Sequence, residues 1–578
     1  MRTAWNEPRH FFFWLTLLSV LAIATISFLD AHTPWLSPPP WMQTCVLVSG
    51  ICLIAGAVVG LFCFILSWIP PIRRLFAWML QRRLFVLACL LTLIALFYTE
   101  EDLRGKLAWN KCRRELEANG AQLNLKAFIP KPVPDEQNFA ATPFVKSCFA
   151  KPNYAATERR WHDAYSRASD NIPQKAERDR HFIDLVAWET ASDVARSSKA
   201  NWYHNAIESH KLDLESRAKA APAVLEMLKT NEAVFAELRA ASHRPYSRYP
   251  IFYDLENPWG ILLPHLSNAR NVCKRLQLKA CAELAAGQGK QALQDVELIL
   301  YMADSFKGEP FLISYLVRIA CLDLSVQPIW EGLAEHAWSD AQLQELQAHL
   351  QQYDFVSDLK LPLDSEQAGG VLTIDLLFKR KYNFGQLTGG NREEMWAADL
   401  LFRIIPHGWY HLEQLSYCRL FQTQLGRTFD PMNKRVWPSR VRNGVQVFEQ
   451  AFSPRNSFNI IVHHRVMSGI LLPALGKLPL RAAKAQTEAD QAALACALER
   501  YRLTNGQFPE SLEALAPRFI SQLSHDVITG EPYKYHRTTD GQFVLYSVGW
   551  NEKEDGGVPG ETLFDEKQGD WVWQYPAP

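Results

Sequence analysis

The stretch that decides the fold of the tail is Ala492–Pro517, AALACALERYRLTNGQFPESLEALAP, followed by Asp526–Gly557, DVITGEPYKYHRTTDGQFVLYSVGWNEKEDGG. Apolar side chains recur at helical spacing between Lys484 and Leu503, which predicts a helix with one apolar face. The members of this stripe are Leu494, Leu498 and Tyr501, with Ala493 and Ala497 beside them. Asn505-Gly506 then supplies the left-handed conformation that ends helices at little cost.

The residues after this helix predict a β-hairpin. Tyr533–Thr538 alternates with the period of a strand. Asp540-Gly541 is a strong two-residue hairpin signal, and Phe543–Val548 returns as the partner strand. Trp571–Trp573 is expected to add an edge strand. Pro509 is expected at the first position of a short helix, where its missing N–H costs nothing.

The order, spacing and turn residues, with the string ERYRLTNGQFPESLEAL, resemble the soluble domain of the major pseudopilin of type II secretion over about Lys484–Tyr575. The resemblance implies a small α+β domain with an antiparallel hairpin. No prepilin leader precedes this helix or appears in the N-terminal MRTAWNEPRHFFF, so we expect a borrowed module rather than a pilin. The whole layout also resembles membrane-anchored bacterial proteins with such a tail, a resemblance that implies no activity.

In the pseudopilin family the loop after the second strand binds calcium. Here that loop reads WNEKEDGGVPGETLFDEKQGDW, and Asn551, Asp555 and Asp570 fall near the matching places. The resemblance therefore implies a calcium site, because hard cations prefer carboxylate and carbonyl oxygens. Asn551 stands where the family has Asp, and Lys553 and Lys567 dilute the negative charge. The alternative is a solvated acidic loop.

Three apolar segments lie in the first 99 residues. They are Phe11–Leu29 with 19 residues, Cys45–Ile69 with 25 and Leu84–Tyr98 with 15. The first two are long enough to cross a hydrocarbon core of about 30 Å, whereas the third reaches only about 22 Å unless Arg82 and Arg83 snorkel. We expect two to three transmembrane helices in residues 1–99. A signal peptide is the alternative for the first segment, but its length favours a retained anchor.

The charges that flank these segments predict their orientation. Arg2 and Arg9 precede the first segment, the loop Asp30–Thr44 has no Lys or Arg, and the next loop holds four Arg. The positive-inside rule places the N-terminus and the second loop in the cytoplasm. If the third segment crosses, everything after Glu100 is extracytoplasmic; if it lies in the interface, the body is cytoplasmic. We favour crossing, which predicts a multi-pass protein of the bacterial inner membrane.

The formal net charge is zero, yet it is unevenly distributed. Residues 1–99 hold six Arg and two acids, a net charge of +4, so the remaining 479 residues carry −4. Nucleic-acid binding needs a concentrated basic face, and this distribution therefore argues against a nucleic-acid partner. The expected partners are the lipid bilayer and envelope proteins.

Residues 100–354 are predicted to form a helical body. Leu266–Phe306 carries two helical stripes separated by AAGQGK and resembles one tetratricopeptide-like hairpin. Phe311–Ser325 and Pro328–His336 are expected as two further helices, and Ser339 with Gln342 forms a capping box. Stacked hairpins bury one another's faces, which predicts a solenoid-like stack.

Residues 355–480 are expected to form a helical and irregular connection, and residues 481–578 the pseudopilin-like α+β domain. Three stretches of the connection are predicted helices: Ser365–Lys381, Glu394–Ile404 and Trp409–Leu425. Phe429–Arg440 is predicted as a loop because of its prolines, and Ile460–Leu475 as a buried helix. The fold class is therefore mainly α, with N-terminal transmembrane helices and a small α+β domain at the C-terminus.

Few residue clusters suggest chemistry. His407 and His411 lie four residues apart with Glu413 nearby, a spacing that can chelate a metal, although no HExxH motif is present. Arg244–Tyr253, RPYSRYPIFY, suits either stacking on a ligand or packing by its own rings. Eleven Cys form no CxxC pair, and Cys112 with Cys148 can either bridge or remain buried free thiols.

These observations lead to three hypotheses of function. The first is a membrane-anchored extracytoplasmic scaffold or interaction protein, because apolar spans, a helix stack and a filament-type module occur without a recognised catalytic motif. The second is a secretion-apparatus component that docks pseudopilins through its tail. The third is an envelope hydrolase with a site at His407, His411 and Glu413. The sequence does not settle whether the protein is an enzyme, and it favours a binding role.

Overall fold

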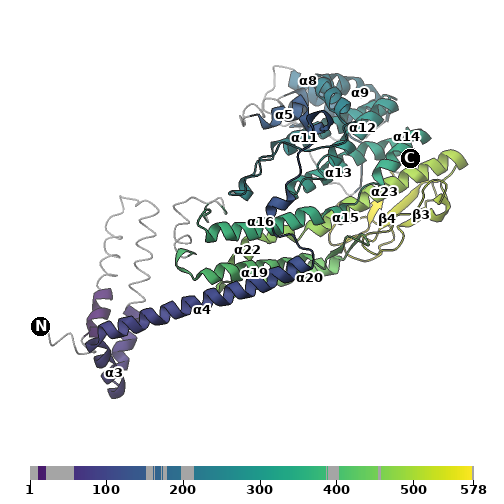
Figure 1. Ribbon diagram of the computed structural model, residues 1–578. Helices are drawn as coiled ribbons and strands as arrows, with labels where there is room; N and C mark the ends of the chain where they lie inside the picture. Colours follow the sequence, from purple (N-terminus) through teal and green to yellow (C-terminus); the bar gives the residue numbers. More distant parts are fainter. Residues whose placement is uncertain are drawn as a thin grey trace. The chain divides into compact units, whose positions relative to one another are not determined.

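The described part of the protein is mainly helical, as predicted, with 65% helix and 5% strand. The computed structural model describes residues 11–20, 57–150, 161, 163–170, 172, 179–196, 214–383, 385, 387, 402–453 and 457–575. The chain divides into two compact units, each assembled from separated stretches (Figure 1). The first unit comprises residues 1–119, 373–416 and 464–470, and the second comprises residues 120–372, 417–463 and 471–578.

The first unit contains the apolar N-terminal segments. Its described helices are Phe11–Val20, Ala57–Leu66, α3 (Pro70–Gln81), α4 (Arg83–Ala118) and α22 (Val466–Leu471), together with the end of α16 (Lys360–Phe378) and the start of α19 (His407–Leu425). The predicted spans Phe11–Leu29 and Cys45–Ile69 lie partly outside the described residues. Their described parts are helical until Leu66, after which the chain turns into α3.

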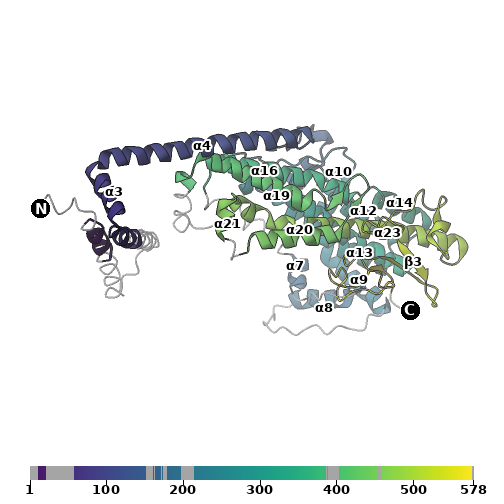
Figure 2. The ribbon, with the colours of Figure 1, turned by 90° about the horizontal axis from the view of Figure 1, so that it is seen from below.

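The third apolar segment is part of a much longer helix than the sequence suggested. Helix α4 has 36 residues, about 54 Å at 1.5 Å per residue, and Figure 2 shows it as one unbroken ribbon. Within the described residues, α4 and α13 (Leu312–Ala334) are the helices long and apolar enough to cross a membrane. Half of the apolar window of α13 is buried against protein, as in a core helix, whereas only 6% of that of α4 is buried.

The second unit is built mostly from packed helices. They are α5 (Pro143–Phe149), α7 (Ala164–Ser169), α8 (Leu185–Arg196), α9 (Leu214–Leu228), α10 (Glu232–Ala241), α11 (Pro264–Ala285), α12 (Gly289–Asp304), α13, α14 (Asp340–Leu350), α15 (Phe355–Asp358), α20 (Pro438–Ala451), α21 (Ser457–Val462) and α23 (Leu478–Asn505). Helices α11, α12 and α13 pack pairwise against one another. The predicted hairpin over Leu266–Phe306 is therefore confirmed as α11 and α12.

Two local predictions in this region have different outcomes. The capping box is confirmed, because the Ser339 hydroxyl accepts from the Gln342 N–H and the Gln342 side chain accepts from the Ser339 N–H. The prediction that Pro328 opens a new helix is wrong, because Pro328 lies inside the single helix α13. Its neighbours in α13 are buried, and this packing stabilises a helix that proline alone would interrupt.

The tail has the helix-and-hairpin order that its sequence predicts. Helix α23 ends at Gly506, whose φ is +78°. Strands β3 (Lys534–Arg537), β4 (Phe543–Ser547) and β5 (Trp571–Trp573) form an antiparallel sheet in that order, and Tyr535 pairs with Leu545. Pro509 does not begin a helix; a short 3-10 turn starts later, at Leu512, after Ser511.

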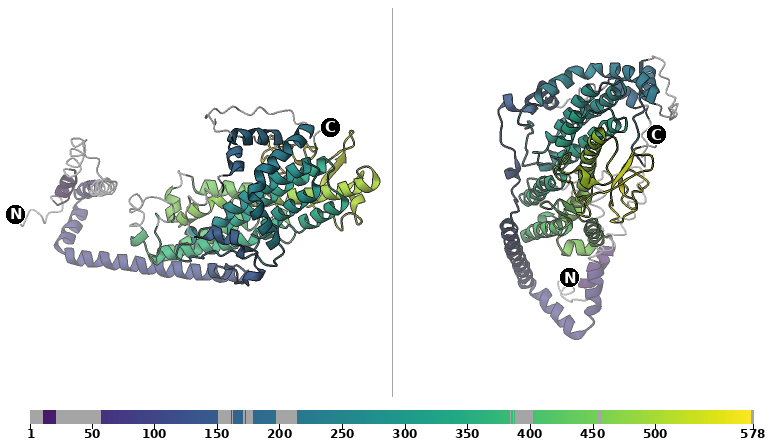
Figure 3. Two further views of the ribbon diagram at one scale, coloured as in Figure 1. Left: turned by 90° about the horizontal axis from the view of Figure 1, so that it is seen from above. Right: turned by 90° about the vertical axis from the view of Figure 1, so that its right-hand side faces the viewer.

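Helix α23 lies in the core of the second unit. It packs against α13 and α14 as well as against strand β4, and almost every side chain from Ala482 to Glu499 is buried. In Figure 3 the yellow-green helix and the yellow strands beside it are visible within the group of teal helices. The second unit therefore includes both the helical body and the tail.

The connection between body and tail contains more structure than expected. Phe429–Arg440 is not simply a loop, because β1 (Phe429–Asp430) and β2 (Arg435–Val436) pair antiparallel and α20 follows directly. Ile460–Leu475 is not one buried helix. It breaks between α21 and α22 near His464, whose φ is +52°, and Ile461 is half exposed. Most of Glu394–Ile404 lies outside the described residues.

Candidate functional site

The three predicted calcium ligands lie together in the loop before β5. The Asp570 carboxylate accepts hydrogen bonds from the Gly557 N–H at 2.7 Å and from the Asp555 N–H at 3.1 Å. The Asp555 carboxylate accepts from the Gly569 N–H at 3.0 Å and from the Asn551 side-chain amide at 2.8 Å. The structure therefore brings Asn551, Asp555 and Asp570 into one cluster.

The donor set of this cluster does not fit a cation in its present arrangement. Backbone N–H groups already occupy carboxylate oxygens of Asp555 and Asp570, and Asn551 points its N–H₂ group at Asp555. Asp570 is 1% exposed, and burial raises the pKa of its carboxyl. The cluster thus braces the loop by hydrogen bonds, and calcium binding stays a prediction that requires the Asn551 amide to turn.

The predicted hydrolase residues have separate contacts. Glu413 accepts from the backbone N–H groups of Val466 at 3.1 Å and Met467 at 3.0 Å, so it holds the start of α22. Burial raises the pKa of Glu413 to about 7. The rings of His407 and His411 both pack against Phe378, with centroid distances of 5.0 and 5.9 Å. Among the described residues, no group of three His, Cys, Asp or Glu side chains is arranged to hold a metal.

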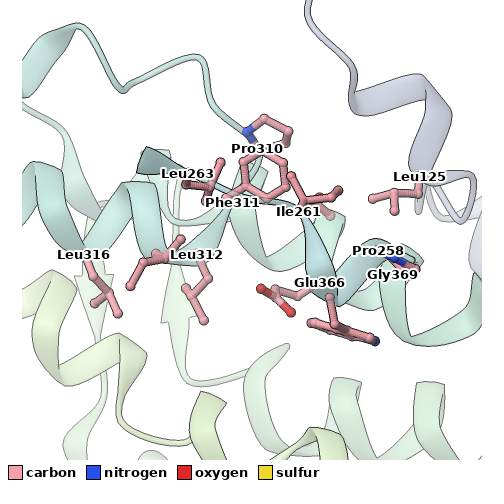
Figure 4. Close-up of a pocket in the computed structure, with 13 residues that line it drawn as sticks. Leu125, Pro258, Ile261, Leu263, Pro310, Phe311, Leu312, Leu316, Glu366 and Gly369 are labelled. Atoms are coloured by element: carbon pink, nitrogen blue, oxygen red, sulfur yellow. The ribbon is translucent and has the colours of Figure 1, made fainter. Parts of the chain in front are cut away.

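A pocket in the second unit was not anticipated from sequence. Its volume is about 270 Å³, and Figure 4 shows the residues around it. It is lined by Leu125, Pro258, Trp259, Ile261, Leu263, Pro310, Phe311, Leu312, Ile313, Leu316, Ser365, Glu366 and Gly369. These residues come from four places in the sequence: Leu125, the segment Pro258–Leu263, the start of α13 with the two residues before it, and the middle of α16.

Glu366 is the single ionisable side chain in this lining. Its carboxyl group points towards Leu312 in Figure 4. Burial in these apolar surroundings raises the pKa of Glu366 to about 7, and no cation or hydrogen-bond donor among the described residues counteracts the shift. The neighbouring Tyr417 donates to the Glu366 backbone carbonyl at 3.1 Å, and its phenol stays neutral because burial raises its pKa well above the ordinary value.

The pocket has an apolar and aromatic rim. Ile313 and Trp259, which both line the pocket, are 51% and 39% exposed. The Tyr253 ring stacks on the Phe311 ring, with a distance of 5.5 Å between the ring centroids. In the stretch Arg244–Tyr253, Tyr249 and Tyr253 therefore pack on rings of the helical body, whereas Tyr246 is 48% exposed.

Little in the sequence indicates this pocket. Glu366 lies in the helical stretch LDSEQAGGVL, where it and Asp364 are typical of residues at a helix surface. The signal that was present is the adjacent pair Gly369 and Gly370. A Cβ at Gly369 would be 3.9 Å from the Trp259 ring, and a Cβ at Gly370 would overlap the Tyr417 ring, so both positions lie against aromatic side chains.

Comparison with known proteins gives no relative. No family model, no curated protein and no solved structure matches this chain.

Proposed function

We propose that this chain is a membrane-anchored scaffold or interaction protein of the bacterial inner membrane. The first unit carries the apolar helices that would lie in the membrane, and the second unit contains the helical, solenoid-like body, which we place outside the cytoplasm. The observation that carries the proposal is the surface of the first half of α4. Side chains all around this half are exposed and apolar, among them Leu84, Phe85 and Leu93 at 78%, 57% and 62% exposure. An isolated helix of this kind is stable in a bilayer and not in water.

The second half of α4 supports the same interpretation, because it packs on protein. The Gly408 N–H donates to the Asp102 carboxylate at 2.6 Å, and the Trp409 indole donates to Glu101 at 3.0 Å. Gly105 lies directly against the Gly408 backbone. Helix α4 thus changes from an apolar surface to a protein-packed surface near Glu100, where a membrane boundary is expected.

Reporter fusions test this topology. Alkaline phosphatase fused after Ala118 is expected to be active, because it would lie outside the cytoplasm. The same enzyme fused after Gln81, in the basic stretch between α3 and α4, is expected to be inactive, and a green fluorescent protein at the same two points should give the opposite pattern. Active phosphatase at Gln81 or inactive phosphatase at Ala118 would contradict the proposed orientation.

A second candidate function is the docking of pseudopilins, for which the tail provides one specific feature. Within the described part of the chain, strand β3 pairs with β4 on one side only, so its other edge is a place where a partner strand can add. The Thr538 N–H bonds to the Gln542 carbonyl, so by alternation the N–H groups of Tyr535 and Arg537 face away from β4, towards this edge. Pseudopilin recovery by the full chain should fall when Arg537 is replaced by Pro, and replacement of the exposed Glu561 should leave it unchanged. Equal recovery by all three proteins would exclude docking through β3.

A further inference from the structure

We propose that the pocket around Glu366 binds a small organic ammonium, a molecule with an apolar body and one protonated amine. The geometry rests on three features of the lining: an apolar cavity, a single carboxyl group and aromatic side chains at its wall. This inference goes beyond the scaffold role, because it assigns a small-molecule ligand to the body.

The size of the cavity fits such a molecule. A cavity of about 150 Å³ lined by apolar side chains accommodates benzene, so the volume of about 270 Å³ found here has room for an aromatic ring with a short amine chain. The lining is apolar except for Ser365 and Glu366. An apolar body is therefore favoured in most of the space, and polar recognition is confined to one end.

The charge of the lining selects a cation. Glu366 is the single ionisable residue among the 13 that line the pocket, and within the described ranges no Lys, Arg or His compensates its carboxylate. A bound ammonium would supply the missing positive charge at hydrogen-bond distance, in surroundings where such a pair is stronger than in water. An anion would instead meet the carboxylate with like charge and be rejected.

The aromatic side chains add to this selection. Trp259 and Phe311 both line the pocket, and the π faces of such rings attract organic cations. Phe311 is fixed by its stack on Tyr253, and the Trp259 ring lies beside Gly369 of α16. In a molecule with one ammonium and one aryl ring, the ammonium can therefore pair with Glu366 while the ring packs against Trp259 and Phe311.

The alternative occupant of the pocket is a neutral molecule, and the pH dependence of binding distinguishes it from an ammonium. The protonated carboxyl of Glu366 can donate to a neutral acceptor, whereas the ionised carboxylate pairs with an ammonium. Because burial raises the pKa of Glu366 to about 7, an ammonium is expected to bind about tenfold more tightly at pH 8 than at pH 6, and a neutral alcohol is expected to bind more weakly at pH 8. Tyr417, the titratable neighbour, stays neutral over this range.

The experiment uses the full chain in lipid nanodiscs and measures dissociation constants by calorimetry at pH 6 and pH 8. The probes are 2-phenylethylamine and its neutral counterpart 2-phenylethanol. The variant Glu366→Gln keeps the size of the side chain and removes its charge, and Glu561→Gln is the matched exposed control. Empty nanodiscs correct for partition of the probes into lipid.

The expected result is that the amine binds tenfold more tightly than the alcohol at pH 8. Glu366→Gln should weaken amine binding at least tenfold and abolish its pH dependence, whereas Glu561→Gln should leave both unchanged. Three results would overturn the proposal: no binding of the amine, equal binding of amine and alcohol at pH 8, or unchanged amine binding by a folded Glu366→Gln protein. Thermal unfolding of the variant confirms that it is folded.

Discussion

At the scale of single residues, Glu366 makes stability depend on pH. Its pKa is about 7 in the folded state, above its ordinary value of 4.5, so the folded protein holds this proton more tightly than the unfolded chain. Stability therefore falls as pH rises from about 4.5 to about 7. Glu366→Gln should match the wild type near pH 5 and exceed its stability at pH 8 by about 2–3 kcal/mol.

Urea unfolding at the two pH values measures this difference. Glu413 and Asp490 also have pKa values raised to about 7 by burial, and they contribute equally to both proteins, so their effects cancel in the comparison. The exposed Glu561→Gln change is expected to leave the stability at both pH values the same as in the wild type. A Glu366→Gln protein that is no more stable than wild type at pH 8 would show that this carboxyl is solvated.

Calcium binding by the tail loop is a second prediction at this scale. Asn551→Asp restores the acid of the pseudopilin pattern and removes the amide that donates to Asp555. Millimolar calcium is therefore expected to raise the melting temperature of Asn551→Asp by several degrees more than that of the wild type. If calcium shifts neither protein, the loop is held by its hydrogen bonds alone.

Several residue-level predictions succeeded because the signal is local. Gly506 ends α23 in the left-handed conformation, Gly541 with φ of +84° makes the hairpin turn, and Ser339 with Gln342 caps α14. Each depends on residues within four positions of one another. Glu366 was missed because its environment comes from the Pro258–Leu263 segment and from α13, which no short window of sequence contains.

At the scale of elements, the contact between α4 and α19 depends on two glycines. A Cβ on Gly105 would overlap the Gly408 carbonyl, and a Cβ on Gly408 would overlap the Glu101 carbonyl. Gly105→Ala is therefore expected to destabilise the first unit by about 1–3 kcal/mol, because backbone atoms cannot give way as a flexible side chain does. Lys106→Ala, an exposed neighbour on the same helix, should change stability by less than about 0.5 kcal/mol.

Thermal unfolding in nanodiscs measures both changes. Equal melting temperatures for Gly105→Ala and the wild type would mean that stability does not depend on the close approach of α4 and α19. The same comparison tests the hydrogen bond from the Trp409 indole to the Glu101 carboxylate, because this bond depends on the close approach of α4 and α19.

Helices with a strong apolar periodicity were predicted well. Elements whose bounds depend on packing against residues distant in sequence were predicted poorly. Helices α11, α12 and α19 follow their apolar patterns. Pro328 suggested a break that the buried environment of α13 does not allow, and the pairing of β1 with β2 involves only two residues of each strand, too few to leave a pattern. The break near His464 was missed because the apolar residues on both sides of it look like one helix.

At the scale of the whole molecule, α23 makes the tail inseparable from the body in the second unit. Its buried leucines at 478, 480, 494 and 498 stabilise this unit by about 1.5–3 kcal/mol each, which together approaches the total stability of a typical domain. A chain that ends at Lys477 is therefore expected to lose the fold of the body. Limited proteolysis should degrade it, whereas a chain that ends at Tyr575 should resist.

A protease-resistant body in the chain that ends at Lys477 would instead show that residues 481–578 form a separate domain, as the four-segment prediction has it. The isolated tail, residues 478–578, provides the complementary sample. We expect it to aggregate, because the faces of α23 that pack on α13 and α14 would be left in water.

The burial of α23 also dictates when the protein can fold. Helix α23 follows α9 to α14 in the chain, so the core of the second unit can close only after residue 505 has left the ribosome. Until then the faces of α13 and α14 that pack on α23 lack their partner. We therefore expect the nascent body to depend on chaperones during synthesis, because exposed apolar surface makes folding intermediates prone to aggregate.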